Sequence, residues 1–174
     1  LVTPNSRLMK KYIARIFNPK FAFLIIGCFW GHLNYAQQAS NKPYSSQLMM
    51  VENHLRVGKY GDALMEMDRI TDLYPNAAEV FYGKALVLAQ IGNLDGAIEN
   101  AVVAYDKEPS ILHGNYLIDL NRAKKNTAEV LRLMQVLRTK FPTYTAISRD
   151  LISTLAANDN LVAAEGIYKE ERGK

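Results

Sequence analysis

The stretch GKYGDAL at residues 58–64 is echoed by GNLDGAI at residues 92–98, 34 positions later. Gly58 matches Gly92, and Ala63 matches Ala97. Self-similarity at a fixed period of about 20 to 50 residues is typical of chains built from one copied structural unit. Glycine lets a backbone reverse between two helices, and alanine lets the second helix pack closely on the first. The two copies therefore predict tandem units, each with a turn followed by a closely packed helix.

Three kinds of mark continue this period along the chain. Small or branched residues follow the turns at spacings of 34, 33 and 34, at Ala63, Ala97, Val130 and Ala164. Prolines close the units at spacings of 34 and 33, at Pro75, Pro109 and Pro142. The turns themselves are Gly58-Lys59, Gly92-Asn93, Lys125-Asn126 and Asp159-Asn160. Apart from Lys125, these residue types favour or tolerate turns.

Between these marks the apolar residues follow helical spacing. Leu48, Val51 and Leu55 follow this spacing in one segment, and Leu64, Met67 and Leu73 follow it in the next. Each unit is thus predicted to be a helix of about 13 residues, a tight turn, a second helix and a proline stop. Neither helix buries its apolar face alone, whereas stacked pairs share a continuous core.

This pattern resembles the tetratricopeptide-repeat family in its period and in its aromatic, small-residue and proline positions. The best copy is AEVFYGKALVLAQIGNLDGAIENAVVAYDKEP, residues 78–109, with Phe81 at the aromatic position and Ala85 at a small one. A third copy, residues 111–142, is degenerate at Gly114 and Asn121. The resemblance implies an all-α fold: a right-handed superhelical array of about four helix-turn-helix repeats over residues 44–174. A Sel1-like array or a simple helical bundle is the alternative fold.

The first 36 residues have the parts of an export signal. Basic residues precede an apolar run of 13 residues, 21–33, and a polar exit follows in which we expect cleavage between Ala36 and Gln37. A spanning helix needs about 20 apolar residues, so this run is short for one, although an uncleaved anchor is an alternative. Lipidation of Cys28, the only cysteine, is another alternative. Residues 37–43 are expected to be a linker, and the protein to be periplasmic or secreted.

Composition argues against several classes of function. From Gln37 onward the chain has 16 Lys and Arg against 17 Asp and Glu, so its charge offers no basis for nucleic-acid binding. The histidines of this part, His54 and His113, lie in different repeats without metal-ligand spacing. No phosphate loop or catalytic constellation is present in the sequence. We therefore expect a non-catalytic protein that uses no metal or cofactor.

The resemblance implies that ligands lie along a concave surface made by the first helix of each repeat. Carried onto this chain, the predicted partner-binding residues are Tyr82, Leu86, Asn115, Asp119, Arg122 and Arg149. An aromatic anchor, an amide and two arginines suit an extended or helical peptide of acidic character. The sequence thus predicts an exported protein-interaction module. The alternative is a lipid-anchored subunit of an envelope assembly or secretion complex, which contacts its partners through the ends of the array. Self-association through these ends is also expected.

Overall fold

A computed structural model of the protein describes residues 42–173. The chain divides into two structural units, and the boundary between them falls between Met49 and Met50, inside the first described helix. The predicted signal peptide at 1–36, the cysteine at position 28 and most of the 37–43 linker lie outside the described residues. Within the described range, no helix is long and apolar enough to cross a membrane.

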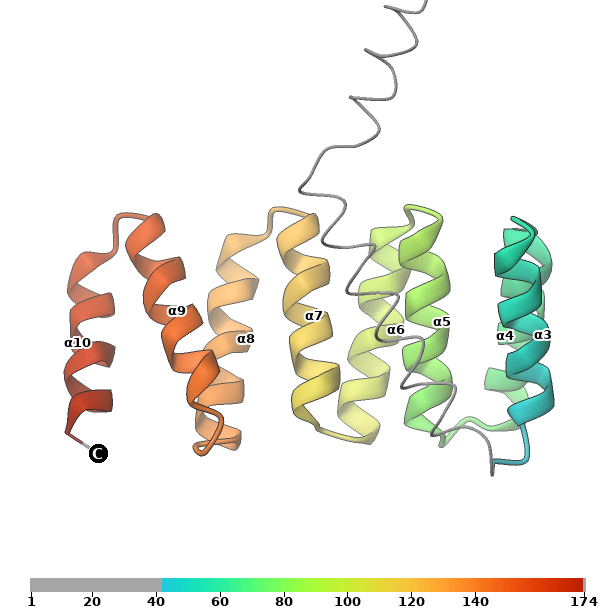
Figure 1. The fold of residues 1–174 in the computed structure, drawn as a ribbon, viewed down its shortest axis with the longest axis horizontal. Helices are drawn as coiled ribbons and strands as arrows, with labels where there is room; N and C mark the ends of the chain where they lie inside the picture. The colour runs from blue at the N-terminus through green and yellow to red at the C-terminus, as the bar shows by residue number, and fades with distance from the viewer. Residues whose placement is uncertain (1–41, 174) are drawn as a thin grey trace, which may run out of the picture. The chain divides into compact units, whose positions relative to one another are not determined.

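Residues 42–173 form eight helices and no strand (Figure 1). The helices are α3 Ser45–Arg56, α4 Tyr60–Leu73, α5 Ala78–Gln90, α6 Leu94–Lys107, α7 Ile111–Ala123, α8 Thr127–Lys140, α9 Thr145–Ala157 and α10 Leu161–Arg172. From α4 to α10, each helix packs against the next one along the chain. The expected all-α series of helical pairs is therefore confirmed.

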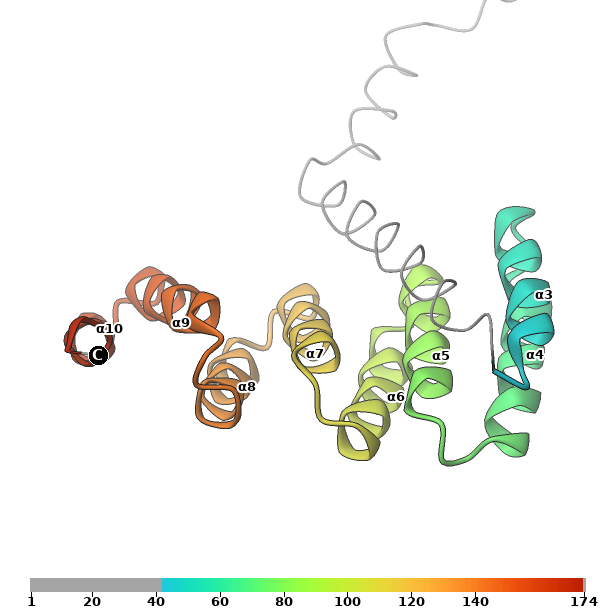
Figure 2. The ribbon, with the colours of Figure 1, turned by 60° about the horizontal axis from the view of Figure 1, so that its bottom comes forward.

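The helices from α5 onward alternate between two rows. Figure 2 shows α5, α7 and α9 in one row and α6 and α8 in the other. The first row holds the first helix of the second, third and fourth repeats. Residues placed at intervals of one repeat are thereby brought onto neighbouring helices of one row.

Each repeat reverses its direction through the same turn. The backbone N–H of Gly92 donates to the carbonyl of Ala89 at 3.0 Å, and the N–H of Asn93 donates to the carbonyl of Leu88 at 2.9 Å. This pair of bonds satisfies the last carbonyls of the helix and requires a left-handed residue at its centre, where Gly92 has φ 82°. The equivalent residues are Gly58 (φ 73°), Lys125 (φ 62°) and Asp159 (φ 58°).

Asparagine follows the left-handed residue in three of the four turns and caps the next helix. The side-chain oxygen of Asn93 accepts from the N–H of Gly96 at 3.0 Å. Asn126 and Asn160 cap α8 and α10 in the same way. Because the first N–H groups of a helix have no intrahelical partner, these side chains fix where each second helix begins.

The small residues after the turns lie at the helix crossings. Ala63 and Ala97 are completely buried, and Val130 and Ala164 are 2% and 6% exposed. Gly114 belongs to the same kind of contact, because a Cβ atom on it would lie 2.3 Å from Cδ2 of Leu137. The helices α7 and α8 therefore approach so closely that no larger residue fits at position 114 without movement of the core.

Candidate functional site

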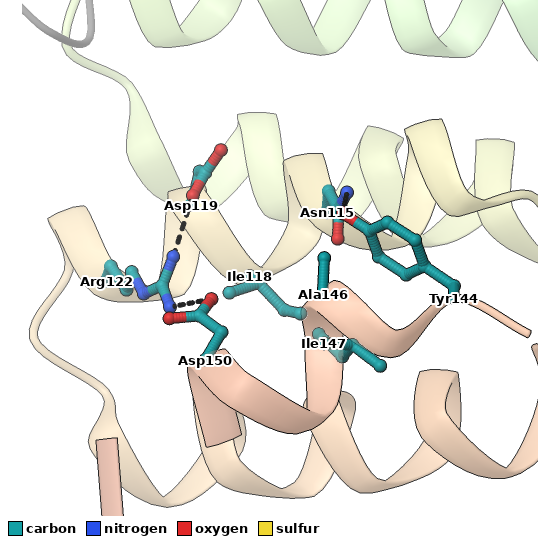
Figure 3. Close-up of a pocket in the computed structure, with 8 residues that line it drawn as sticks. All are labelled: Asn115, Ile118, Asp119, Arg122, Tyr144, Ala146, Ile147 and Asp150. Atoms are coloured by element: carbon teal, nitrogen blue, oxygen red, sulfur yellow. Dashed lines mark hydrogen bonds and ion pairs between the residues drawn. The ribbon is translucent and has the colours of Figure 1, made fainter. Parts of the chain in front are cut away.

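A pocket of about 330 Å³ opens between α7 and α9, the first helices of the third and fourth repeats. Figure 3 shows a cluster of charged side chains at one end of the pocket, a polar pair at the other and apolar side chains between them. The lining residues are Asn115, Ile118, Asp119, Arg122, Tyr144, Ala146, Ile147 and Asp150. Because α7 and α9 belong to the same row, the pocket lies on the first-helix side of the array.

The charged end is an ion-pair cluster centred on Arg122. Its Nη1 donates to Oδ1 of Asp119, one helical turn away on α7, at 3.3 Å. Its Nη2 donates to Oδ2 of Asp150, on α9, at 2.6 Å (Figure 3). One guanidinium thus faces two carboxylates, so the three ionised groups carry a net charge of −1.

The two carboxylates are not fully compensated by this arginine. Desolvation by burial raises the pKa of Asp119, and the nearby charge of Asp150 raises it further, while Arg122 acts in the opposite direction. The balance is an increase, so this site favours the neutral form of Asp119 more than water does. Keeping the Asp119 carboxylate ionised therefore costs the folded protein some free energy of stability. Charged groups held at such a cost are found in many binding sites.

The polar end joins the two helices through uncharged groups. Nδ2 of Asn115, on α7, donates to the hydroxyl oxygen of Tyr144 at 3.1 Å. Tyr144 occupies the N-cap position of α9 and makes no side-chain capping bond there. Between the two ends lie Ile118 and Ile147, each 2% exposed, so the pocket has a fixed apolar floor.

Three of the six predicted partner-binding residues meet in this pocket. They are Asn115, Asp119 and Arg122, which follow one face of α7. Arg149 is exposed on α9 but does not line the pocket. The neighbouring Asp150 does, and sequence reasoning missed it.

The physical reason for this miss is the geometry of adjacent helices. The sequence prediction assigned equivalent positions of α7 and α9 to the groove. A pocket between the two helices is lined instead by the side of α7 that faces α9 and by the side of α9 that faces α7. The helical spacing of Ala146, Ile147 and Asp150 was the available signal, since these residues share one side of α9.

The expectation that Tyr82 is an exposed anchor is wrong. Tyr82 is 5% exposed, and its ring lies 5.3 Å from that of His113 and 5.1 Å from that of Tyr116. Leu86 is also buried, at 4% exposed. Eight of the 13 residues of α5 are buried, so this helix is covered on more than one face and offers little surface to a partner.

The described residues, 42–173, contain no group of three or more His, Cys, Asp or Glu side chains that could hold a metal ion. His113 is buried at 5% exposed, and its Nδ1 lies 2.8 Å from the carbonyl oxygen of Glu108. Its ring packs on Tyr82. These contacts give His113 a structural role in joining α5 to α7.

MamA and Naa15, whose solved structures have a similar fold, are tetratricopeptide-repeat proteins. A crystal structure of MamA matches with a TM-score of 0.58 and 13% identity, over 76% of this chain and 73% of that one. MamA from Desulfovibrio magneticus RS-1, from residue 41 to its end, matches with a TM-score of 0.56 and 18% identity, over 97% and 94% of the two chains. The helices form a tetratricopeptide-repeat array.

A longer protein contains a similar array. A chain of the Naa15/Naa10 structure bound to HypK-THB matches with a TM-score of 0.60 and 15% identity, over 88% of this chain and 25% of that one. The present chain thus spans about a quarter of that protein. The sequence matches no protein-family model and no curated protein. At these identities the likeness concerns the tetratricopeptide fold alone.

Proposed function

We propose that the protein is a non-catalytic interaction module that binds a segment of a partner protein in the groove along α7 and α9, the first helices of the third and fourth repeats. The observation that carries the proposal is the pocket between α7 and α9, which lies on the side where repeat arrays of this type form extended binding surfaces. The similar array in the Naa15/Naa10 structure bound to HypK-THB supports a role in protein binding.

The place where the module acts is a second part of the proposal. The basic stretch, apolar run and polar exit of residues 1–36 support export to the periplasm or beyond. The intact mass and N-terminal sequence of the protein from its native host test this. A chain that begins at Gln37 supports export with cleavage, whereas one that begins at an acylated Cys28 supports a lipid-anchored subunit.

An alternative contact surface is the terminal helix, α10. It exposes 66% of Leu161, 85% of Val162 and 49% of Tyr168. Large apolar side chains left in water at the end of an array are typical of a surface that another chain or repeat covers. This observation favours the alternative function, a subunit that contacts its complex through the end of the array.

Site-specific photo-crosslinking in the native host separates the two surfaces. A photoreactive amino acid is placed in turn at Arg149 or Ser153, exposed on α9, at Gln135, exposed on α8 in the other row, and at Val162 on α10. The proposal predicts adducts with one protein from the two α9 positions and none from Gln135. Adducts from Val162 alone would establish the end of the array as the contact surface and overturn the groove.

A further inference from the structure

The α7–α9 pocket contains three acceptor oxygens that receive no hydrogen bond from the described residues. Arg122 uses Oδ1 of Asp119 and Oδ2 of Asp150, so each carboxylate keeps a second oxygen that accepts no hydrogen bond from residues 42–173. Asn115 donates through Nδ2 to Tyr144, and its own side-chain oxygen is a third such acceptor. The unused donors are the hydroxyl hydrogen of Tyr144, the second Nδ2 hydrogen of Asn115 and the remaining N–H groups of Arg122.

The charge of the pocket is negative. The two carboxylates outnumber the one guanidinium, and each terminal nitrogen of Arg122 is bonded to one of them. An anionic ligand bound to Arg122 would lie beside both carboxylates and be repelled by them. A cationic ligand would instead donate to the free carboxylate oxygens and offset the net negative charge.

The floor of the pocket is compatible with an apolar stem. Ile118 and Ile147 are buried between the charged end and the polar end of the pocket (Figure 3). Lysine and arginine carry three or four methylene groups below their charged heads, and they lay these stems on apolar surface while the head stays at a polar rim. A metal ion is a poorer fit, because the described residues contain no group of three or more His, Cys, Asp or Glu side chains that could hold one.

We infer that the pocket holds a basic side chain, lysine or arginine, of the partner segment, with its stem on Ile118 and Ile147 and its head between Asp119 and Asp150. This inference rests on the proposed function and adds the chemistry of the ligand. It replaces the acidic peptide expected from the sequence, because the structure pairs Arg122 with two carboxylates of its own chain. It also assigns Asp150 a binding role in addition to its contact with Arg122.

Methyl NMR of the full chain tests the inference, since the δ1 methyl groups of Ile118 and Ile147 report from the floor. Their resonances are assigned by replacing each isoleucine with valine. The probes are Nα-acetyl-arginine amide, Nα-acetyl-lysine amide, Nα-acetyl-citrulline amide, which is a neutral isostere of the first, and Nα-acetyl-glutamate amide. We expect saturable shifts of both methyl resonances with arginine or lysine, and binding of citrulline weaker by at least about fivefold.

Variants identify the groups that bind the cation. Asp119→Asn and Asp150→Asn should each weaken binding of the arginine probe by at least about threefold to tenfold. Asp72→Asn, the same change at an exposed position of α4, is the matched control and should leave it unchanged. Thermal melts check the fold, and Asp119→Asn is expected to lose no stability at neutral pH because its site disfavours the charged form.

The outcomes separate the ligand chemistry from the proposed function. Equal binding of citrulline and arginine, shifts with glutamate alone, or no saturable shift with either basic probe overturns the inference, and adducts from Arg149 and Ser153 would still support the groove. Arginine binding without such adducts overturns the peptide as the source of the cation, and the proposed function fails with it. Loss of binding of the arginine probe in Asp119→Asn and Asp150→Asn, together with adducts from the groove, supports both the inference and the proposed function.

Discussion

Lys125 adopts a left-handed backbone conformation, with φ 62°, where two other repeats carry glycine. A side chain in this conformation places Cβ near the following carbonyl oxygen, which costs about 1 to 2 kcal/mol. Lys125 is exposed and forms no ion pair in the described part of the chain that would offset this cost. We therefore expect Lys125→Gly to stabilise the fold by about 0.5 to 1 kcal/mol, measured by urea unfolding.

The control for this prediction is a second substitution at the same residue. Lys125→Ala removes the same charge but keeps Cβ, so it should give no comparable gain. Gly92→Ala, at the equivalent turn with φ 82°, should lower stability by about 1 kcal/mol. A similar stability for the glycine and alanine variants at position 125 would show that this turn relaxes without strain.

Gly114 illustrates a different constraint on a single residue. A methyl group there would overlap the side chain of Leu137, which is 1% exposed, so the buried leucine or the helix would have to shift. Gly114→Ala is expected to destabilise the protein by about 1 to 3 kcal/mol in thermal or urea melts. Gly166→Ala, where no atom lies within 4 Å of the added Cβ, should instead raise stability by about 0.5 to 1 kcal/mol. A harmless Gly114→Ala would mean that α7 and α8 separate easily.

Position 114 also shows a limit of reasoning from a repeat pattern. The sequence marked Gly114 as a departure from the residue type expected in the family, which suggested a weak repeat. The structure makes it a close contact, because a bulky partner, Leu137, fills the space that a larger residue would occupy. A pattern compares residue types along the chain and does not register the size of the side chain across the interface.

At the scale of the helix, α6 separates a buried face from a solvated one. Ala97 is completely buried, whereas Lys107 is exposed with its Nζ 5.2 Å from the centre of the Phe81 ring. Ala97→Leu should therefore destabilise the protein by about 1 to 3 kcal/mol through overpacking. Lys107→Leu should cost at most about 1 kcal/mol, from the lost cation–π contact. Equal melting temperatures for the two variants would place the helix interface elsewhere.

Helices could be predicted from the sequence more fully than the site could. The turns at Gly58, Gly92, Lys125 and Asp159 all lie where the period placed them, because each turn depends on local backbone bonds. The site depends on which faces of α7 and α9 approach each other. This is set by packing between helices, so the α7 residues were found and Asp150 was missed.

At the scale of the array from residue 50 onward, ion pairs join successive repeats on top of the apolar contacts. Lys84 of α5 pairs with Asp68 of α4 at 2.7 Å, and Lys124 pairs with Asp95 of α6. Each of these pairs bridges only neighbouring repeats. Because contacts in such arrays are confined to neighbours, stability is close to a sum of repeat and interface terms, and the end repeat is expected to open before the centre.

The terminal helix offers a direct test of this view. Nη2 of Arg138, on α8, donates to Glu170 at 2.6 Å and to Glu171 at 3.0 Å on α10. Glu171 also accepts from the hydroxyl of Ser148, on α9. Arg138→Ala removes the bridge to Glu170 and to Glu171, whose side chain is 19% exposed. We expect a loss of about 1 kcal/mol confined to the last repeat.

Hydrogen exchange followed helix by helix measures where that loss falls. In Arg138→Ala the amides of α10 should exchange about fivefold faster, since about 1.4 kcal/mol corresponds to tenfold, while those of α5 and α6 change little. Lys169→Ala is the control, because its pair with Glu165 lies within α10 and both side chains are more than half exposed, so its effect should stay within about 0.5 kcal/mol. Equal acceleration in every helix of the Arg138 variant would show that the array unfolds as one cooperative unit. In that case α10 would not unfold independently of the other helices. Its exposed apolar side chains would then belong to a helix as stable as those at the centre of the array.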